Sequence, residues 1–214
     1  MMRCLSPEEA EELLRQSDFS IVLDPESSHQ MLVLEDGVAG KQTRVAAKPP
    51  AQVGQLAQFI EAVNRWLPSN RRRLFWIDHW QLAGALHNSE TFVRAARAGL
   101  DERRSLEGAP GHLFSSHPYG ETDVLEIGDE HNRDAGVLVS LATLMITEGS
   151  YGWLIAEGGN DRVEFWAGSI VLHSADAQQL KAARDLFRAF NCELWSSSRG
   201  LAGLASRITQ RRRA

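Results

Sequence analysis

The stretch from Asp123 to Phe190 constrains the fold more than any other part of this 214-residue chain. It begins at Asp123–Ile127, where polar and apolar residues alternate as they do in a half-buried strand. Gly128 and Asp129 end that strand, Asn132 or Asp134 offers an N-cap, and an almost continuously apolar run then extends to about Thr147. The run is shorter than the roughly 20 residues of a membrane span, but long enough for a helix. Because it offers no polar face, we expect a helix that lies entirely inside the protein.

The second part of the same stretch predicts a hairpin followed by a helix. Tyr151–Ala156 and Arg162–Trp166 flank a Glu-Gly-Gly-Asn-Asp turn, in which Gly and Asn supply the positive φ values that a tight turn needs. Ser169–His173 either continues the second strand or forms a third strand. Ser174 offers an N-cap to an amphipathic helix, for which Asn191 is a suitable end.

The first hundred residues predict a second set of helices and strands. The expected elements are a helix that begins at Pro7, a hairpin over 19–34, a strand over 43–47, a helix over 53–67, a central strand over 74–77 and a helix over 89–100. Leu106–Gly120 is rich in Gly, Pro, Ser and His, so we expect a long loop or a boundary there.

Together these elements predict an α+β fold, with one mixed, largely antiparallel sheet and helices packed against it. We expect a single globular domain over residues 1–195. Its two halves, 1–105 and 120–195, have similar element order and are joined by the loop. One continuous sheet is favoured because neither half alone would bury much surface. Residues 196–214 form a basic tail, either mobile or helical.

The charge of the chain argues against nucleic-acid binding by the body of the protein. The formal net charge is −5, and the tail contributes five arginines and no acid, so residues 1–195 carry −5 − 5 = −10. A nucleic-acid contact is expected only through the tail, at Arg211, Arg212 and Arg213. An acidic body instead favours a basic partner.

Cysteine usage and hydropathy predict a cytoplasmic protein with no membrane partner. Cys4 and Cys192 lie at opposite ends of the chain and match neither a metal-binding spacing nor a disulfide framework. We therefore expect two free thiols in a reducing compartment. The N-terminus lacks an apolar signal region, and no stretch is long enough to cross a bilayer.

Candidate catalytic residues are few. Asp78 and His79 follow an apolar strand, and polar residues at such a strand end often face the active site of an α/β enzyme. With Glu126 or His173 they would form an acid–base pair. The alternative is a strand end whose polar groups meet water. Cys192 follows a helix end, so nothing there lowers its pKa for nucleophilic chemistry.

A metal site would have to come from loop residues. His112, His117 and His131 would bind a divalent ion, together with Asp129 and Glu130, if the loop folds back on the following helix. The alternative is that all five are solvated. No phosphate-binding or dinucleotide-binding motif is present, and we expect no cofactor.

The six tryptophans are the most informative residues for function. Trp76 and Trp153 fall within apolar strands and are expected in the core. Three others fall near element ends: Trp80, Trp166 and Trp195. There an indole ring packs on the protein while its N–H donates a hydrogen bond to water. Because tryptophan is enriched at binding hot spots, we assign these three to a partner-binding surface.

These observations favour a non-enzymatic protein over an enzyme. We expect it to recognise a protein partner of basic charge. In element order the chain is similar to small bacterial immunity or antitoxin proteins, although no residue motif carries that similarity. Two alternatives stay open. One is a small metal-dependent hydrolase or acid–base enzyme, and the other is a structural component of a larger assembly.

Overall fold

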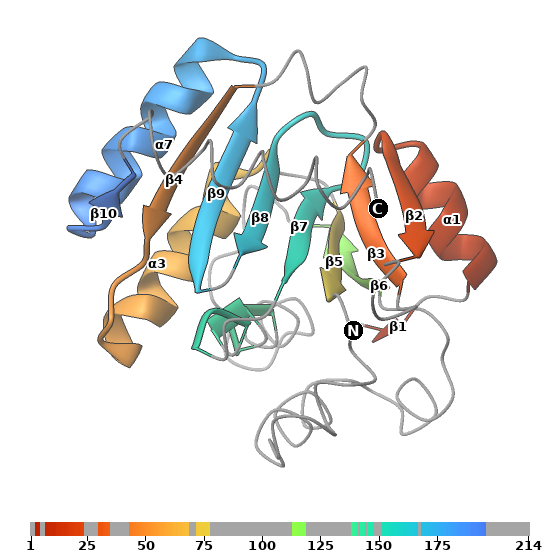
Figure 1. Cartoon of the computed structure of the whole chain (residues 1–214), viewed down its shortest axis with the longest axis horizontal. Helices are drawn as coiled ribbons and strands as arrows, with labels where there is room; N and C mark the ends of the chain where they lie inside the picture. The colour runs from red at the N-terminus through yellow and green to blue at the C-terminus, as the bar shows by residue number, and fades with distance from the viewer. Residues whose placement is uncertain are drawn as a thin grey trace.

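An eight-stranded antiparallel sheet forms the centre of the computed structural model (Figure 1). The structure describes residues 3–4, 7–23, 30–34, 43–68, 72–77, 113–118, 138–140, 142–143, 145–147, 151–166 and 168–195. The strand order in space is β1-β6-β5-β7-β8-β9-β4-β10. The strands are β1 (Arg3–Cys4), β4 (Thr43–Lys48), β5 (Arg72–Ile77), β6 (Leu113–Pro118), β7 (Gly152–Ala156), β8 (Arg162–Trp166), β9 (Ser169–Ser174) and β10 (Glu193–Leu194). With the helices packed on it, this sheet confirms the predicted α+β fold.

The middle of the sheet is a meander of β7, β8 and β9. Its first turn contains Gly158 at φ 62°, and the amide of Gly159 donates to the carbonyl of Ala156 at 2.8 Å. Gly168, at φ 76°, lies in the second turn and lets the chain reverse between β8 and β9. Ser169–Ser174 is therefore a third strand, paired with β8, and not a continuation of it.

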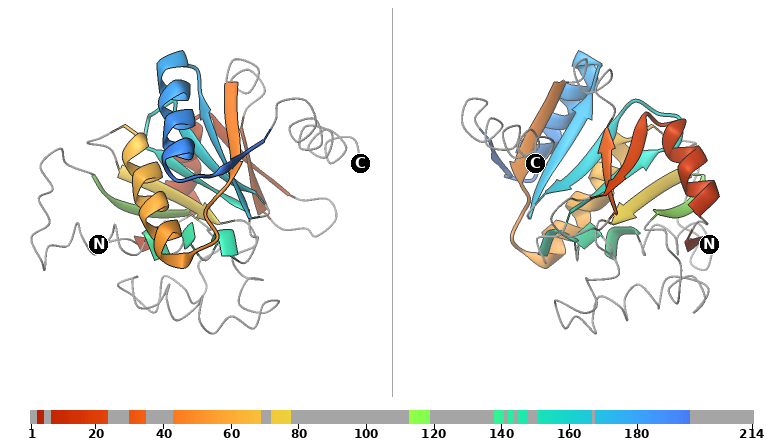
Figure 2. Two further views of the ribbon diagram at one scale, coloured as in Figure 1. Left: turned by 90° about the vertical axis from the view of Figure 1, so that its left-hand side faces the viewer. Right: turned by 45° about the vertical axis from the view of Figure 1, so that its right-hand side comes forward.

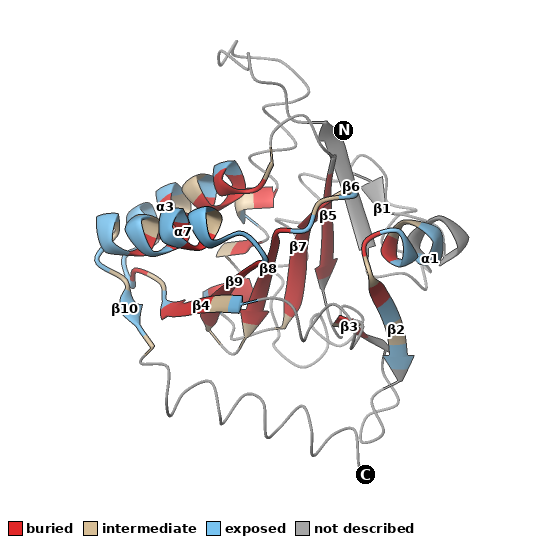
Figure 3. Ribbon diagram, turned by 90° about the horizontal axis from the view of Figure 1, so that it is seen from above, coloured by how far each residue is buried: buried red, intermediate tan, exposed pale blue. Residues whose placement is uncertain are grey.

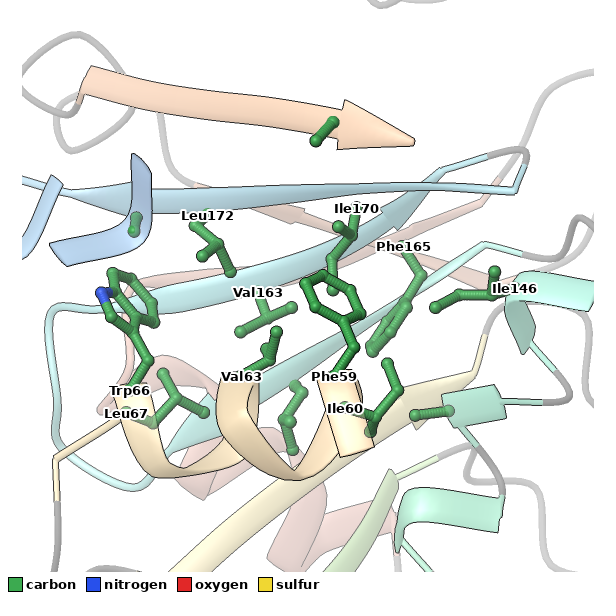
Figure 4. Close-up of a cluster of buried hydrophobic side chains, with 14 of the residues drawn as sticks. Phe59, Ile60, Val63, Trp66, Leu67, Ile146, Val163, Phe165, Ile170 and Leu172 are labelled. Atoms are coloured by element: carbon green, nitrogen blue, oxygen red, sulfur yellow. The ribbon is translucent and has the colours of Figure 1, made fainter. Parts of the chain in front are cut away.

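Two helices, α3 (Val53–Trp66) and α7 (Ala177–Ala189), cover one face of the sheet (Figures 2 and 3). Phe59 of α3 packs against Phe187 and Phe190, with ring centroids 5.9 and 5.5 Å apart. Figure 4 shows the apolar face of α3 lying against Val163 and Leu172 of the sheet. Each fully buried side chain of this kind contributes about 1.5–3 kcal/mol, so this layer is the main core.

A smaller unit lies on the opposite face of the sheet (Figure 3). It consists of α1 (Pro7–Arg15), β2 (Phe19–Leu23) and β3 (Gln30–Leu34), and we call it the cover. Its strands form the predicted hairpin as a separate two-stranded sheet. Its apolar side chains pack on Leu74, Trp76, Trp153 and Ile155 to form a second core cluster. Burial of Trp76 and Trp153 confirms the prediction for these two tryptophans.

The structure corrects two predictions about the middle of the chain. Leu113–Pro118, predicted to be part of a long loop, forms β6 and pairs with both β5 and β1. Residues 138–140, 142–143 and 145–147 are helical, but Ser140 and Thr147 are exposed. These two polar residues are seven positions apart and share one helix face, so the helix is amphipathic and not entirely interior. Asp123–Ile127 lies outside the residues that the structure describes.

The start of α7 is capped by a different residue than predicted. Asp176, and not Ser174, is the N-cap, since its carboxylate accepts from the amide of Gln178 at 2.8 Å. The hydroxyl of Ser174 accepts from the amide of Asp176 at 2.9 Å and so supports the cap from two residues earlier. The helix ends as predicted near Asn191, which adopts φ 53°.

Among the residues that the structure describes, no helix is long and apolar enough to cross a membrane.

Candidate binding surface

Two of the three tryptophans assigned to partner binding lie at ends of strands in the sheet. Trp166 is the last residue of β8, and Trp195 directly follows β10. Both side chains are half-buried. The ring of Trp166 meets that of Tyr151 edge to face, with centroids 4.9 Å apart and planes at 80°. Trp80 lies outside the described residues.

Strand register places these aromatic residues on one face of the sheet. In β8, Val163 and Phe165 point into the core under the helices, so Trp166 points to the opposite face. The amide of Trp195 donates to the carbonyl of Ala46 at 2.9 Å, which continues the pairing of β10 with β4 by one residue. The same alternation therefore places Trp195 on the face that carries Trp166.

Charged residues lie between the two tryptophans on this face. Lys48 of β4 is opposite Glu193 of β10, and their charged atoms are 3.9 Å apart. Both side chains are mostly exposed, so the pair contributes little to stability. We call Tyr151, Trp166, Trp195, Lys48 and Glu193 the aromatic margin. It combines large half-buried rings with charges that are free to exchange partners.

A buried acid–imidazole pair lies next to the aromatic margin on the same sheet face. Glu164 and His173 belong to β8 and β9, and their side chains meet at 2.8 Å. Only 7% and 8% of the two side chains is exposed, and the imidazole also packs against the ring of Trp153 at 5.4 Å. A carboxylate that orients an imidazole is the geometry of a general base. Such burial leaves almost no surface for a substrate, so we assign the pair a structural role.

A buried guanidinium lies further along the same face of β8. Arg162 donates to the carbonyl of Ser17 at 2.8 Å, to the carboxylate of Asp18 at 2.9 Å and to the carbonyl of Asn160 at 2.8 Å. Burial lowers the pKa of Arg162, and the charge of Asp18 opposes that change. These bonds tie the cover to the sheet. Sequence reasoning missed both Arg162 and Glu164, because polar residues alternating along a strand indicate a wet face.

The other predicted site residues give no assembled centre. Asp78, His79, Glu126, His112 and His131 lie outside the described residues, and so do Arg211, Arg212 and Arg213 of the tail. His117 falls within β6. In the part of the chain that the structure describes, no group of three His, Cys, Asp or Glu side chains could hold a metal ion. The metal and catalytic predictions that involve undescribed residues stay predictions.

The environment of Cys192 favours the protonated thiol over the nucleophilic thiolate. Cys192 is half-buried behind α7, and burial raises its pKa to about 11. This agrees with the prediction that nothing near Cys192 lowers its pKa.

Comparison with known proteins adds no relative to these observations. The chain matches no protein-family model, no curated protein and no solved structure.

Proposed function

We propose that this protein is a non-enzymatic binding protein that holds a protein partner against the aromatic margin. The observation that carries the proposal is the half-buried Tyr151–Trp166 pair with Trp195 on the same sheet face. Partly exposed aromatic rings are the anchors that dominate protein interfaces. The exposed charges of Lys48 and Glu193 supply a polar rim around them.

The proposed partner is a basic protein. The whole chain carries −5, and long-range attraction between opposite net charges speeds association. Acidic and basic residues are nearly balanced among the described residues, so the acidic excess comes from other parts of the sequence. Charge would therefore act on the rate of encounter, while the aromatic margin holds the complex together. An immunity-type or antitoxin-type inhibitor of a basic toxin domain would work in this way, in the cytoplasm.

The test compares capture by the wild-type protein with capture by a Trp166→Ala/Trp195→Ala variant at low salt. The wild type should retain one stoichiometric partner, which is then purified for calorimetry. The single variants Trp166→Ala and Trp195→Ala are measured in the same way. Loss of a hot-spot tryptophan costs about 2 kcal/mol or more of binding free energy, so each single variant should raise the Kd roughly 30-fold. Circular dichroism and thermal unfolding check that the variants are folded.

The matched control is Arg184→Ala, which alters an exposed residue of α7 on the helix-covered side of the molecule. Its affinity should equal that of the wild type. A double variant that binds as tightly as the wild type would exclude the aromatic margin as the binding surface. The complete absence of a partner at low salt would count against a binding function.

A further inference from the structure

The cover is attached to the main sheet without strand pairing. β2 pairs with β3 and, among the described strands, with no other. The chain leaves the main sheet after β1, at one edge, and re-enters it at β4, near the opposite edge. Between these two points of the chain, the cover lies at the β5 and β7 side of the sheet, on whose residues it packs (Figure 1). Its hydrogen bonds within the hairpin would survive separation from that face.

Apolar contacts between the cover and the sheet bury a surface rich in tryptophan. Four cover residues meet four sheet residues in the second core cluster: Leu14, Phe19, Leu32 and Leu34 against Leu74, Trp76, Trp153 and Ile155. Phe19 and Trp153 meet edge to face, with centroids 4.9 Å apart. Among the residues that the structure describes, this cluster contains eight buried residues, far fewer than the core under α3 and α7.

In the described part of the chain, a buried guanidinium of the sheet contacts one turn of the cover. The guanidinium of Arg162 reaches the carbonyl of Ser17 and the carboxylate of Asp18, and it lies 5.4 Å from the ring centre of Phe19. Asp18 adopts φ 62°, a conformation that few residues other than Gly, Asn and Asp tolerate, and 41% of its side chain is exposed. Nε of Arg162 finds no hydrogen-bond partner within the described structure. One donor of the guanidinium that contacts this turn therefore stays unsatisfied.

From these contacts we propose that the cover opens as one unit while the main sheet stays folded, and that opening uncovers Trp76 and Trp153. Cooperative units of this kind often coincide with supersecondary motifs that make few contacts with the rest of a protein. A hairpin with its own helix fits that description. The opening uncovers a normally hidden aromatic surface that adjoins the aromatic margin on the same face of the sheet.

Native-state hydrogen exchange of the full chain tests the proposal. Amides of 19–23 and 30–34 should exchange as one group, with a lower opening free energy than those of β7, β8 and β9. Asp18→Asn keeps the side chain's tolerance of positive φ and removes the charge that Arg162 contacts. It should accelerate exchange of the cover about five- to tenfold and leave the main sheet unchanged, because charge-assisted hydrogen bonds are roughly twice as strong as neutral ones.

Asp185→Asn is the control, since it alters an exposed ion pair with Arg188 on α7, away from the cover. It should leave exchange of the cover unchanged. The proposal is overturned if the cover exchanges only through global unfolding. It is equally overturned if Asp18→Asn accelerates the cover and the main sheet by the same factor.

Discussion

The buried Glu164–His173 contact makes stability sensitive to either side chain. In Glu164→Ala, the imidazole nitrogen that the carboxylate contacts at 2.8 Å loses its partner within the fold. A buried polar group without a partner costs about 1–3 kcal/mol, so urea unfolding should show a loss of that size. Glu193→Ala, at an exposed position, should change stability by less than about 0.5 kcal/mol. Equal effects of the two variants would show that the buried contact contributes nothing.

Cys192 allows a second test at the residue scale, through its pKa. Burial raises that pKa from 9.0 to about 11, so the thiolate fraction at pH 8 is about a hundredfold lower than for an ordinary cysteine. In a Cys4→Ser background, labelling by Ellman's reagent should be correspondingly slow at pH 8 and rise about tenfold per pH unit. The same protein in urea should react at the normal rate. Fast labelling of the folded protein at pH 8 would contradict the burial of this thiol.

The sign of the linked stability change follows from the same pKa. The folded protein holds the Cys192 proton more tightly than the unfolded chain does. This contribution to stability is therefore complete below pH 9 and is lost as the pH rises through about 11.

At the scale of single elements, α7 depends on its N-cap. Asp176→Ala removes the acceptor of the Gln178 amide and should destabilise the protein by about 1 kcal/mol in urea unfolding. Gln178→Ala is the matched control, because it truncates an exposed side chain of the first turn and keeps the backbone amide that Asp176 caps. This control should have little effect on stability. If Asp176→Ala were as stable as Gln178→Ala, the cap would not stabilise the helix.

Sequence patterns predicted the elements whose apolar residues recur at regular spacing. They missed the elements that form only by pairing with an adjacent strand. α3, α7 and the strands β7 and β8 follow their apolar spacing closely. β1 and β10, each two residues long, were not predicted, and β6 was expected to be a loop. These strands are defined by pairing with adjacent strands and not by local composition. Arg73 is a similar case: it is buried because Asn64 and the carbonyl of Pro68, at the end of α3, accept its hydrogen bonds.

At the scale of the whole molecule, the sheet order could not be read from the sequence. β4 lies beside β9, and β5 lies beside β7, although long segments separate each pair in the chain. This order and its register bring Trp166 and Trp195 onto one face of the sheet, with β9 and β4 between their strands, and local sequence does not determine that arrangement. The sequence did not place Tyr151 beside Trp166, since Tyr151 directly precedes a strand and contacts Trp166 only after β7 and β8 pair.

The shortness of the two outermost strands has a consequence for the protein at high concentration. Among the described residues, β1 and β10 each offer two residues to an incoming chain, and the contact between Lys48 and Glu193 places charge beside the β10 edge. Long, flat, uncharged edges are the templates from which sheets grow into fibrils. A sheet that ends in such brief, charged strands resists that growth, so a concentrated solution of the native protein should not seed amyloid.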